Sequence, residues 1–187
     1  MPAAARIAVL VVTSLNKPQY LTERAIPLAE NVAAATPGLH FFASDTPDAR
    51  AEAERRGCVF RPFFAGDAAT LACPELKGAP LTLVECADVK WGAAGPCCKA
   101  DAALARWRRD VRRETEYVIL TDDDVTWDPT ALEAGLDDFS RPLAPDALWV
   151  SGNRAHGAKQ IFWRARRPRG EASHGRAAYS RGQRCPG

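Results

Sequence analysis

Short apolar runs rich in β-branched residues alternate with segments of helical periodicity along most of this chain. Runs without polar alternation are typical of strands that are buried on both faces of a parallel sheet. Strands that alternate with helices in this way predict an α/β domain with a mainly parallel, doubly wound sheet. We expect strands at 6–13, 39–43, 58–60, 81–85, 117–121 and 147–150, and helices at 20–35, 48–56, 97–114 and 130–139.

Local signals refine this pattern at three places. Pro27 lies inside the first helical segment and is expected to kink it, because proline cannot donate the helical hydrogen bond. Either Ser44 or Asp45 is the expected N-cap of helix 48–56. Residues 62–80 contain three prolines and two glycines, and we expect an irregular loop there.

Length and composition exclude several classes of protein. A chain of 187 residues is the size of one domain. With 47% apolar and 26% charged residues, it can form a core and is not globally disordered. No apolar run approaches the roughly 18–20 residues that span a bilayer, and the N-terminus does not have the pattern of a secretory signal. The chain as given is therefore expected to be soluble.

The net charge of +2 is unevenly distributed. Residues 154–187 contain eight arginines and one lysine against Glu171 alone, a local charge of +8, so residues 1–153 carry −6. We expect the folded domain to occupy residues 1–153 and a basic, disordered tail to follow it. A basic tail can bind nucleic acid, but this one lacks interleaved aromatic residues and any nucleic-acid-binding motif, so we expect no nucleic-acid partner.

The cysteines do not have the spacing of a structural zinc site. None forms a C-x-x-C pair, and no paired histidines accompany them. The residues alone leave disulfides and buried thiols open. The six cysteines are at positions 58, 73, 86, 97, 98 and 185.

Three consecutive aspartates, Asp122, Asp123 and Asp124, follow the apolar strand at 117–121 directly. In open α/β sheets, ligands bind beyond the carboxyl ends of the strands, where these residues are expected. Carboxylates this close repel one another unless a cation lies among them. Oxygen ligands select Mg²⁺ or Mn²⁺, which complete their coordination with water and substrate phosphate. The pattern therefore predicts a metal-diphosphate site, and a solvated turn whose aspartates cap the next segment is the alternative.

A second chemistry uses the same segment. Asp122-x-Asp124-x-Thr126 after an apolar strand resembles the first motif of haloacid-dehalogenase-type phosphohydrolases, in which Asp122 would be the nucleophile. Such an enzyme also needs a later serine or threonine, a lysine and an acidic pair that ends another strand. Ser151 and Lys159 supply the first two, but Asp137-Asp138 is in a helical segment. The phosphohydrolase therefore remains the minor alternative.

A series of motifs between residues 7 and 153 resembles, in order, the Fringe-like β-1,3-glycosyltransferases. The most specific is the aromatic-apolar strand that ends in Asp-Asp-Asp; it follows a Cys-Lys segment and a helix, as it does in that family. The motifs are Val12-Thr13-Ser14, Arg24, Phe41 to Asp48, Glu85-Cys86, Cys98-Lys99-Ala100, Tyr117 to Val125 and Leu148 to Gly152.

The resemblance implies a GT-A fold, a UDP-sugar donor and Mn²⁺, or Mg²⁺ in its place. Asp124 would ligate the metal, and Asp122 or Asp123 would contact the ribose or the sugar of the donor. The reaction implied is inverting transfer of a hexose or N-acetylhexosamine to a hydroxyl of a glycoprotein or glycan acceptor. The residues expected around the uridine diphosphate are Thr13, Arg24 and Asp45.

The chain departs from the family beyond its last matching strand. The family's Gly-Gly-Ala-Gly segment, its catalytic aspartate and its metal-binding histidine are not recognisable here, and His156 and His174 lack the right flanking residues. The catalytic base is therefore unassigned. We expect the donor-binding and metal-binding portion of such an enzyme, and an inactive nucleotide-sugar-binding fragment is the alternative.

The resemblance also implies a disulfide between Cys86 and either Cys97 or Cys98, and we take Cys98 as the candidate. Such a bond would place the protein in an oxidising secretory lumen. Fringe-like enzymes are usually type II Golgi membrane proteins, so the resemblance implies the Golgi lumen. We expect membrane association only through an anchor, and no such segment is recognisable in this sequence. Free thiols in a cytosolic chain are the alternative.

Overall fold

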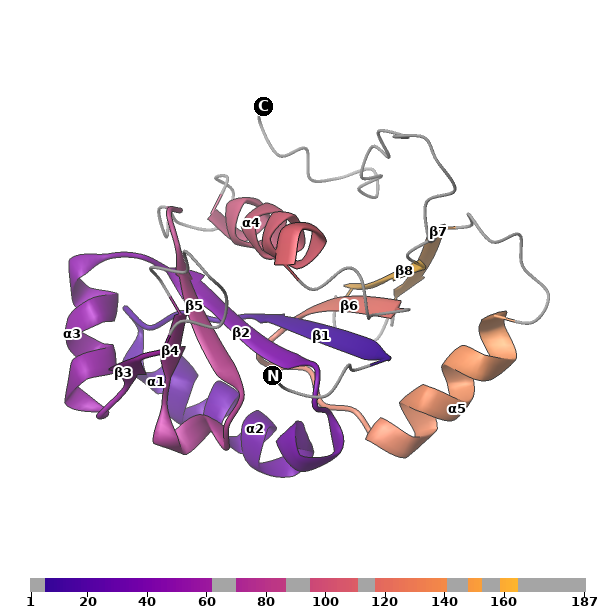
Figure 1. The fold of residues 1–187 in the computed structure, drawn as a ribbon, viewed down its shortest axis with the longest axis horizontal. Coiled ribbons are helices and arrows are strands. Elements are labelled where there is room, and N and C mark those ends of the chain that lie inside the picture. Colours follow the sequence, from indigo (N-terminus) through magenta and orange to yellow (C-terminus); the bar gives the residue numbers. More distant parts are fainter. Residues whose placement is uncertain are drawn as a thin grey trace.

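The computed structural model describes residues 6–61, 70–86, 95–110, 117–140, 148–152 and 159–164, which form one sheet with helices on both faces (Figure 1). The sheet has eight strands in the order β3-β4-β5-β2-β1-β6-β8-β7. The strands are β1 (Ile7–Val12), β2 (Leu39–Ser44), β3 (Val59–Phe60), β4 (Thr70–Ala72), β5 (Pro80–Val84), β6 (Tyr117–Asp122), β7 (Leu148–Gly152) and β8 (Lys159–Arg164). The helices are α1 (Pro18–Tyr20), η1 (Leu21–Ala25), α2 (Ile26–Val32), η2 (Ala33–Ala35), α3 (Pro47–Arg55), η3 (Pro74–Leu76), α4 (Gly95–Asp110) and α5 (Pro129–Ser140).

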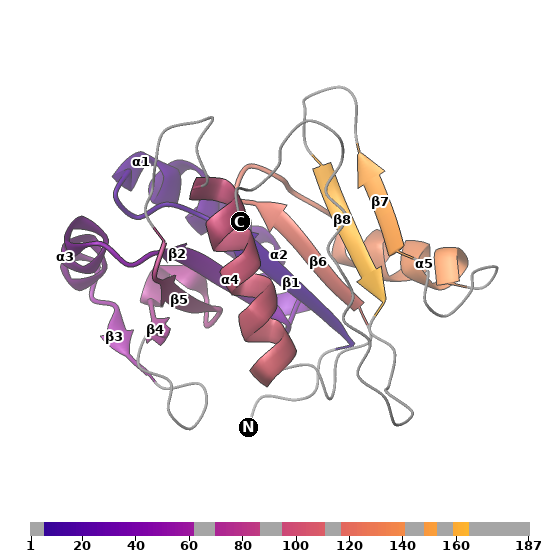
Figure 2. The same ribbon diagram turned by 90° about the horizontal axis from the view of Figure 1, so that it is seen from above.

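The four central strands, β5, β2, β1 and β6, are parallel. Val9 in β1 is opposite Leu39 in β2 and Ile119 in β6, so these three apolar strands share one register. Antiparallel pairing adds β4 and β3 at one side and β8 and β7 at the other (Figure 2). The predicted α/β class with a mainly parallel, helix-flanked sheet is therefore confirmed.

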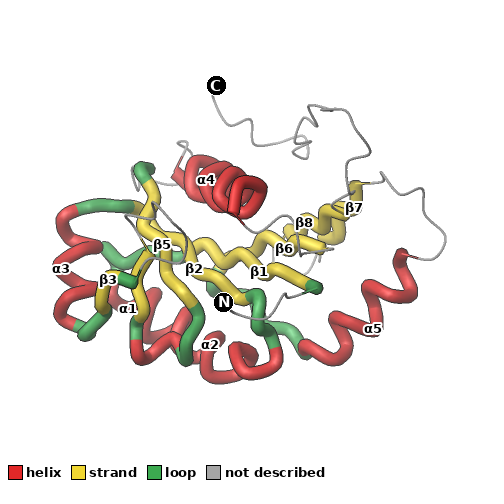
Figure 3. Tube along the Cα trace, viewed as in Figure 1, coloured by secondary structure: helices red, strands yellow, loops and turns green. Residues whose placement is uncertain are grey.

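The core consists of two apolar layers, one on each face of the sheet. Alternate residues of β1 point to opposite faces, as the pleat of a strand requires. Val9 and Val11 pack with the helices α2 and α3, whereas Leu10 packs with Trp107 of α4. The helix α4 therefore covers one face, and the helical run from α1 to α2 lies with α5 on the other (Figure 3).

The first helical segment changes its winding just before Pro27. Residues 18–35 are helical throughout, but Leu21–Ala25 forms a π turn. Pro27 has no N–H to donate to the carbonyl of Glu23, and its ring crowds that carbonyl. A widened turn is one way to accommodate this, so the expected irregularity at Pro27 takes the form of a π turn before it.

The N-cap prediction for the next helix was wrong by one or two residues. Thr46 caps α3, because its Oγ1 accepts a hydrogen bond from the backbone N–H of Ala49 at 3.1 Å. Ser44 is the last residue of β2, where it is buried. Asp45 is engaged elsewhere, since Arg50 donates two hydrogen bonds to its carboxylate.

Two other predictions require correction. The loop expected at 62–80 contains the strand β4 and the short helix η3, and a disulfide joins Cys73, which lies between them, to Cys58. The domain boundary expected after residue 153 falls inside the sheet, because Lys159–Arg164 forms β8. This strand pairs with both β6 and β7, so it completes the sheet rather than belonging to a tail. Residues 165–187 lie outside the described residues.

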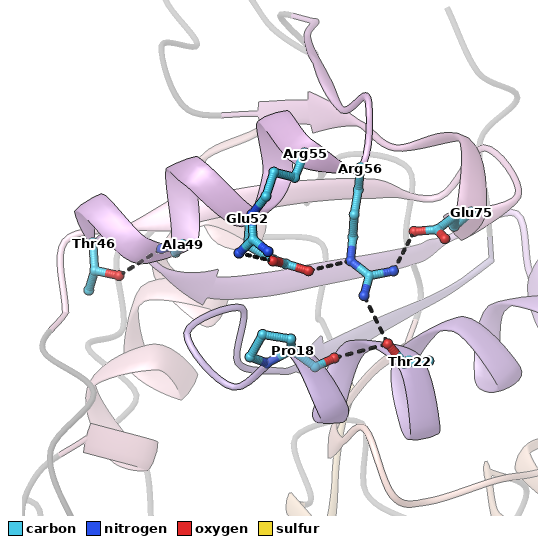
Figure 4. Close-up of polar contacts among 8 residues, drawn as sticks. All are labelled: Pro18, Thr22, Thr46, Ala49, Glu52, Arg55, Arg56 and Glu75. Atoms are coloured by element: carbon cyan, nitrogen blue, oxygen red, sulfur yellow. Dashed lines mark hydrogen bonds and ion pairs between the residues drawn. The ribbon is translucent and has the colours of Figure 1, made fainter.

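A network of charged side chains joins α3 to the first helical segment (Figure 4). Arg56 donates hydrogen bonds to Glu52 at 2.5 Å, to Glu75 at 2.9 Å and to Thr22 at 2.8 Å. Arg55 also forms an ion pair with Glu52, whose side chain is buried. Arg56 therefore connects α3, η3 and η1 on one face of the sheet.

The helices in the described ranges are too short or too polar to cross a lipid bilayer.

Candidate functional site

Polar residues follow the carboxyl ends of two neighbouring strands, β1 and β6. From β1 the chain adds β2 and then β5 on one side, whereas β6 joins β1 on the other side, so the strand order reverses at β1. In open α/β sheets, ligands bind at such a reversal, beyond the carboxyl ends of the strands. Thr13 follows β1, and Asp122, Asp123 and Asp124 end or follow β6. The fold therefore brings these four predicted residues to one place.

Asp123 is the most firmly held of the three aspartates, and only 6% of its surface is exposed. Its Oδ2 accepts a hydrogen bond from Thr13 Oγ1 at 2.6 Å, across the two neighbouring strand ends. Its Oδ1 lies 3.6 Å from Arg24 Nη1. Burial raises the pKa of the Asp123 carboxyl, whereas the Thr13 hydrogen bond and the Arg24 charge lower it.

Arg24 connects Asp123 to Asp124. The same nitrogen, Nη1, lies 3.5 Å from Asp124 Oδ2, so two carboxylates face one positive charge. The Asp124 side chain is 55% exposed, in contrast to the buried Asp123. Arg24 comes from the π turn η1, and its guanidinium lies 4.2 Å from the centre of the Tyr20 ring. The irregular turn before Pro27 thus carries a residue of the site.

Asp122 is exposed, yet its carboxyl is poorly accommodated as an anion. Desolvation by the surrounding protein raises its pKa first, and the negative charges of Asp124 and Asp123 raise it further. The positive charges of Lys99 and Arg24 act in the opposite direction. Burial and neighbouring carboxylates both disfavour the charged form of a carboxyl, so the two causes act together.

Lys99 is a residue of the site to which sequence reasoning gave no role. It lies on α4, is buried, and donates a hydrogen bond from Nζ to the backbone oxygen of Thr13 at 3.0 Å. The sequence did contain a sign that Lys99 is buried: it lies one helical turn before Ala103, which is on the buried face of α4. A lysine in such a stripe is a charge inside the protein and requires a partner.

The remaining site predictions have different outcomes. Asp45 follows β2 at the same sheet edge, but its carboxylate is paired with Arg50 and not with the aspartate cluster. Cys86 and Cys98 form a disulfide, which is the candidate chosen from the two pairs that the resemblance allowed. His156 and His174 lie outside the described residues, and Asp137-Asp138 lies inside α5.

The residues at this edge fit a hard divalent cation that is shared with a phosphate ligand. In the described part of the chain, no three histidine, cysteine, aspartate or glutamate side chains converge on one point. Magnesium and manganese bound together with phosphate need only one or two protein carboxylates. Asp123 and Asp124 already converge on a single positive charge, that of Arg24, and both present oxygen. Oxygen is the ligand that these ions prefer.

The charges of the site residues are also compatible with a divalent cation. The three aspartates and their two cationic neighbours, Lys99 and Arg24, have a summed formal charge of −1 when all five groups are ionised. An anionic diphosphate would be repelled by that charge. One divalent cation would reverse that sign to +1, a charge that is compatible with a diphosphate.

No family model matches the chain, and no curated protein matches it.

Proposed function

We propose that this chain binds a UDP-sugar through Mn²⁺ or Mg²⁺ at the carboxyl ends of β1 and β6, and that it is a glycosyltransferase domain of GT-A type. The observation that carries the proposal is the convergence of Asp123 and Asp124 on one positive charge where the strand order reverses. The position of these carboxylates at the ends of parallel strands and their oxygen ligands both suit a metal-diphosphate. The order of the Fringe-like sequence motifs supports a sugar nucleotide as the specific ligand.

In this proposal each residue of the site has its own role in binding. Asp124 is the exposed carboxylate that would hold the metal ion, and Asp123, fixed by Thr13, would set the position of Asp124 and face the donor. Lys99 would hold the turn after β1. Arg24 would pass from its carboxylate partners to the diphosphate or the uridine. The bound metal would offset negative charge on the departing UDP.

The acceptor half of the reaction is a proposal from the resemblance alone. It specifies inverting transfer of a hexose or N-acetylhexosamine to a hydroxyl of a glycoprotein or glycan, for which a carboxylate base is needed. The two disulfides of the described residues favour an oxidising compartment, because disulfides persist there. That this compartment is the Golgi lumen is a proposal from the resemblance alone.

The test is the product formed from a panel of UDP-hexoses and UDP-N-acetylhexosamines, with Mn²⁺, in the presence and absence of glycan acceptors. We expect Mn²⁺-dependent release of UDP that is lost in Asp124→Asn. The matched control is Asp48→Asn, which neutralises an exposed aspartate in the first turn of α3 and should retain the activity. Failure to release UDP from any donor, by a protein shown to be folded, would contradict the transferase. Release of inorganic phosphate from phosphomonoesters, abolished in Asp122→Asn, would establish the phosphohydrolase instead.

A further inference from the structure

A continuous chain of contacts links a disulfide to the buried aspartate of the site. Cys98 is bonded to Cys86, which lies two residues beyond the end of β5. Lys99 is the next residue, and its Nζ donates to the backbone oxygen of Thr13 at 3.0 Å. The hydroxyl of Thr13 in turn donates to Asp123 at 2.6 Å. Three elements, α4 and the ends of β1 and β6, are thus connected through side chains.

The two bonds of Thr13 make it the central link of this chain. Its carbonyl is held by Lys99 and its hydroxyl holds Asp123, so a displacement of the turn after β1 moves the Asp123 contact as well. The backbone N–H of Thr13 donates to the backbone oxygen of Phe42 in β2 at 2.8 Å. The turn after β1 is therefore held by three hydrogen bonds of one residue. Lys99 therefore contacts Asp123 indirectly, through Thr13.

Lys99 needs a fixed backbone, because a lysine side chain is long and has many rotamers. Further along α4, Ala103 and Trp107 are buried against the sheet and fix the body of the helix. Near its beginning, the Cys86–Cys98 disulfide ties the helix to the end of β5. The disulfide therefore fixes the backbone at Cys98, the residue immediately before Lys99.

We propose that Lys99 is a positioning residue for the site and that the Cys86–Cys98 disulfide holds it in place, so that reducing this one disulfide weakens binding of the metal-nucleotide. The inference rests on the proposed function for its ligand, UDP with Mn²⁺, but its structural part concerns the free protein. Loss of the disulfide would release the first turns of α4, then the Lys99 contact with Thr13, and then the fixed position of Asp123. Loss of the other disulfide would release none of these contacts.

The second disulfide supplies a matched control. Cys58–Cys73 spans 15 residues and Cys86–Cys98 spans 12, so removing either one frees an unfolded-state loop of similar length. Cys58 precedes the edge strand β3 and Cys73 follows β4, so this bond is not part of the contact chain. Variants Cys58→Ser/Cys73→Ser and Cys86→Ser/Cys98→Ser should therefore lose similar stability and differ only at the site.

The experiment measures Kd for UDP in the presence of Mn²⁺ by calorimetry in the wild type and both double-serine variants. We expect the Cys86→Ser/Cys98→Ser variant to bind about 10- to 100-fold more weakly, as is typical when the groups that orient metal ligands are lost. The control variant should stay within about twofold of the wild type, because its site contacts are intact. Lys99→Met, which keeps both disulfides, should reproduce the loss, and Lys99→Arg should restore part of the affinity.

A second readout needs no ligand. Hydrogen exchange at the Thr13 amide, which is bonded to Phe42, should quicken in Cys86→Ser/Cys98→Ser and in Lys99→Met but not in the control. A wild type that binds no UDP would refute the proposed function, and the exchange rates would still decide the positioning role. Equal exchange in the two double-serine variants would overturn the inference. So would equal affinities in the two variants where the wild type binds.

Discussion

Removing the charge of Arg56 should destabilise the fold far more than removing that of its neighbour Arg55. Both arginines pair with Glu52, whose exposed fraction is only 3%. Arg56 also donates to Glu75 and Thr22 (Figure 4). Its side chain is 19% exposed, whereas that of Arg55 is 69% exposed. The substitutions Arg56→Met and Arg55→Met keep most of each apolar stem and remove the charged head, so they form a matched pair.

The magnitude follows from what remains around Glu52 in each variant. Removing one partner of a fully buried ion pair costs about 3–5 kcal/mol. Arg55 still pairs with Glu52 in Arg56→Met, and Glu75 can be solvated, so we expect the loss to be smaller, about 2–3 kcal/mol. Arg55→Met removes the exposed partner of Glu52, which keeps its ion pair with Arg56, so this variant should lose less than about 1 kcal/mol.

The assay is urea unfolding followed by tryptophan fluorescence, with both disulfides intact. A double-mutant cycle of Arg56→Met with Glu52→Gln should give a coupling energy of at least about 1 kcal/mol, because the two side chains are in direct contact. If the two methionine variants lost the same small free energy of unfolding, the assignment of Arg56 as the link between α3, η3 and η1 would be refuted.

Three further predictions concern single positions. Gly38→Ala would place a Cβ 2.1 Å from the backbone oxygen of Ile7, so β1 must shift, and thermal unfolding should show a loss of about 1–3 kcal/mol or more. Thr46→Ala removes the cap of α3 and should cost about 1 kcal/mol in urea unfolding; no change would mean that the cap contributes nothing. The raised pKa of Asp122 means that its neutral form favours the fold, a contribution that is present at low pH and lost as pH rises through the folded-state pKa. Asp122→Asn should therefore raise the Tm of the chelator-treated protein at pH 7 but not below about pH 4, and an unchanged Tm at both pH values would contradict this.

The central part of the fold could be predicted from sequence because its strands are apolar on both faces. The runs that became β1, β2 and β6 have few polar residues, and the residues that follow them mark where each strand ends. The outer strands gave much weaker signals. The strand β8 has a short apolar segment among basic residues, and β4 is three residues long, so both depend on pairing with strands that already exist.

The aspartate cluster was also predictable, because three carboxylates after a buried strand are unusual and their position at the sheet edge follows from parallel pairing. The contacts that organise the cluster were not. Lys99 is distant from Thr13 in sequence, and only the packing of α4 on the sheet brings them together. For Asp45 the contact that sequence reasoning missed is a local one. Its carboxylate, which the resemblance had placed near the donor, forms an ion pair with Arg50.

The most direct test of the account is calorimetric titration of UDP into the wild type, Asp124→Asn and Asp48→Asn, each with Mn²⁺ and with chelator. We predict that the wild type and Asp48→Asn bind UDP only when Mn²⁺ is present, because the site alone carries negative charge. Asp124→Asn should lose this metal-dependent binding while its unfolding remains cooperative. Absence of binding in the folded wild type, or equal binding by Asp124→Asn, would contradict a metal-nucleotide site at the ends of β1 and β6.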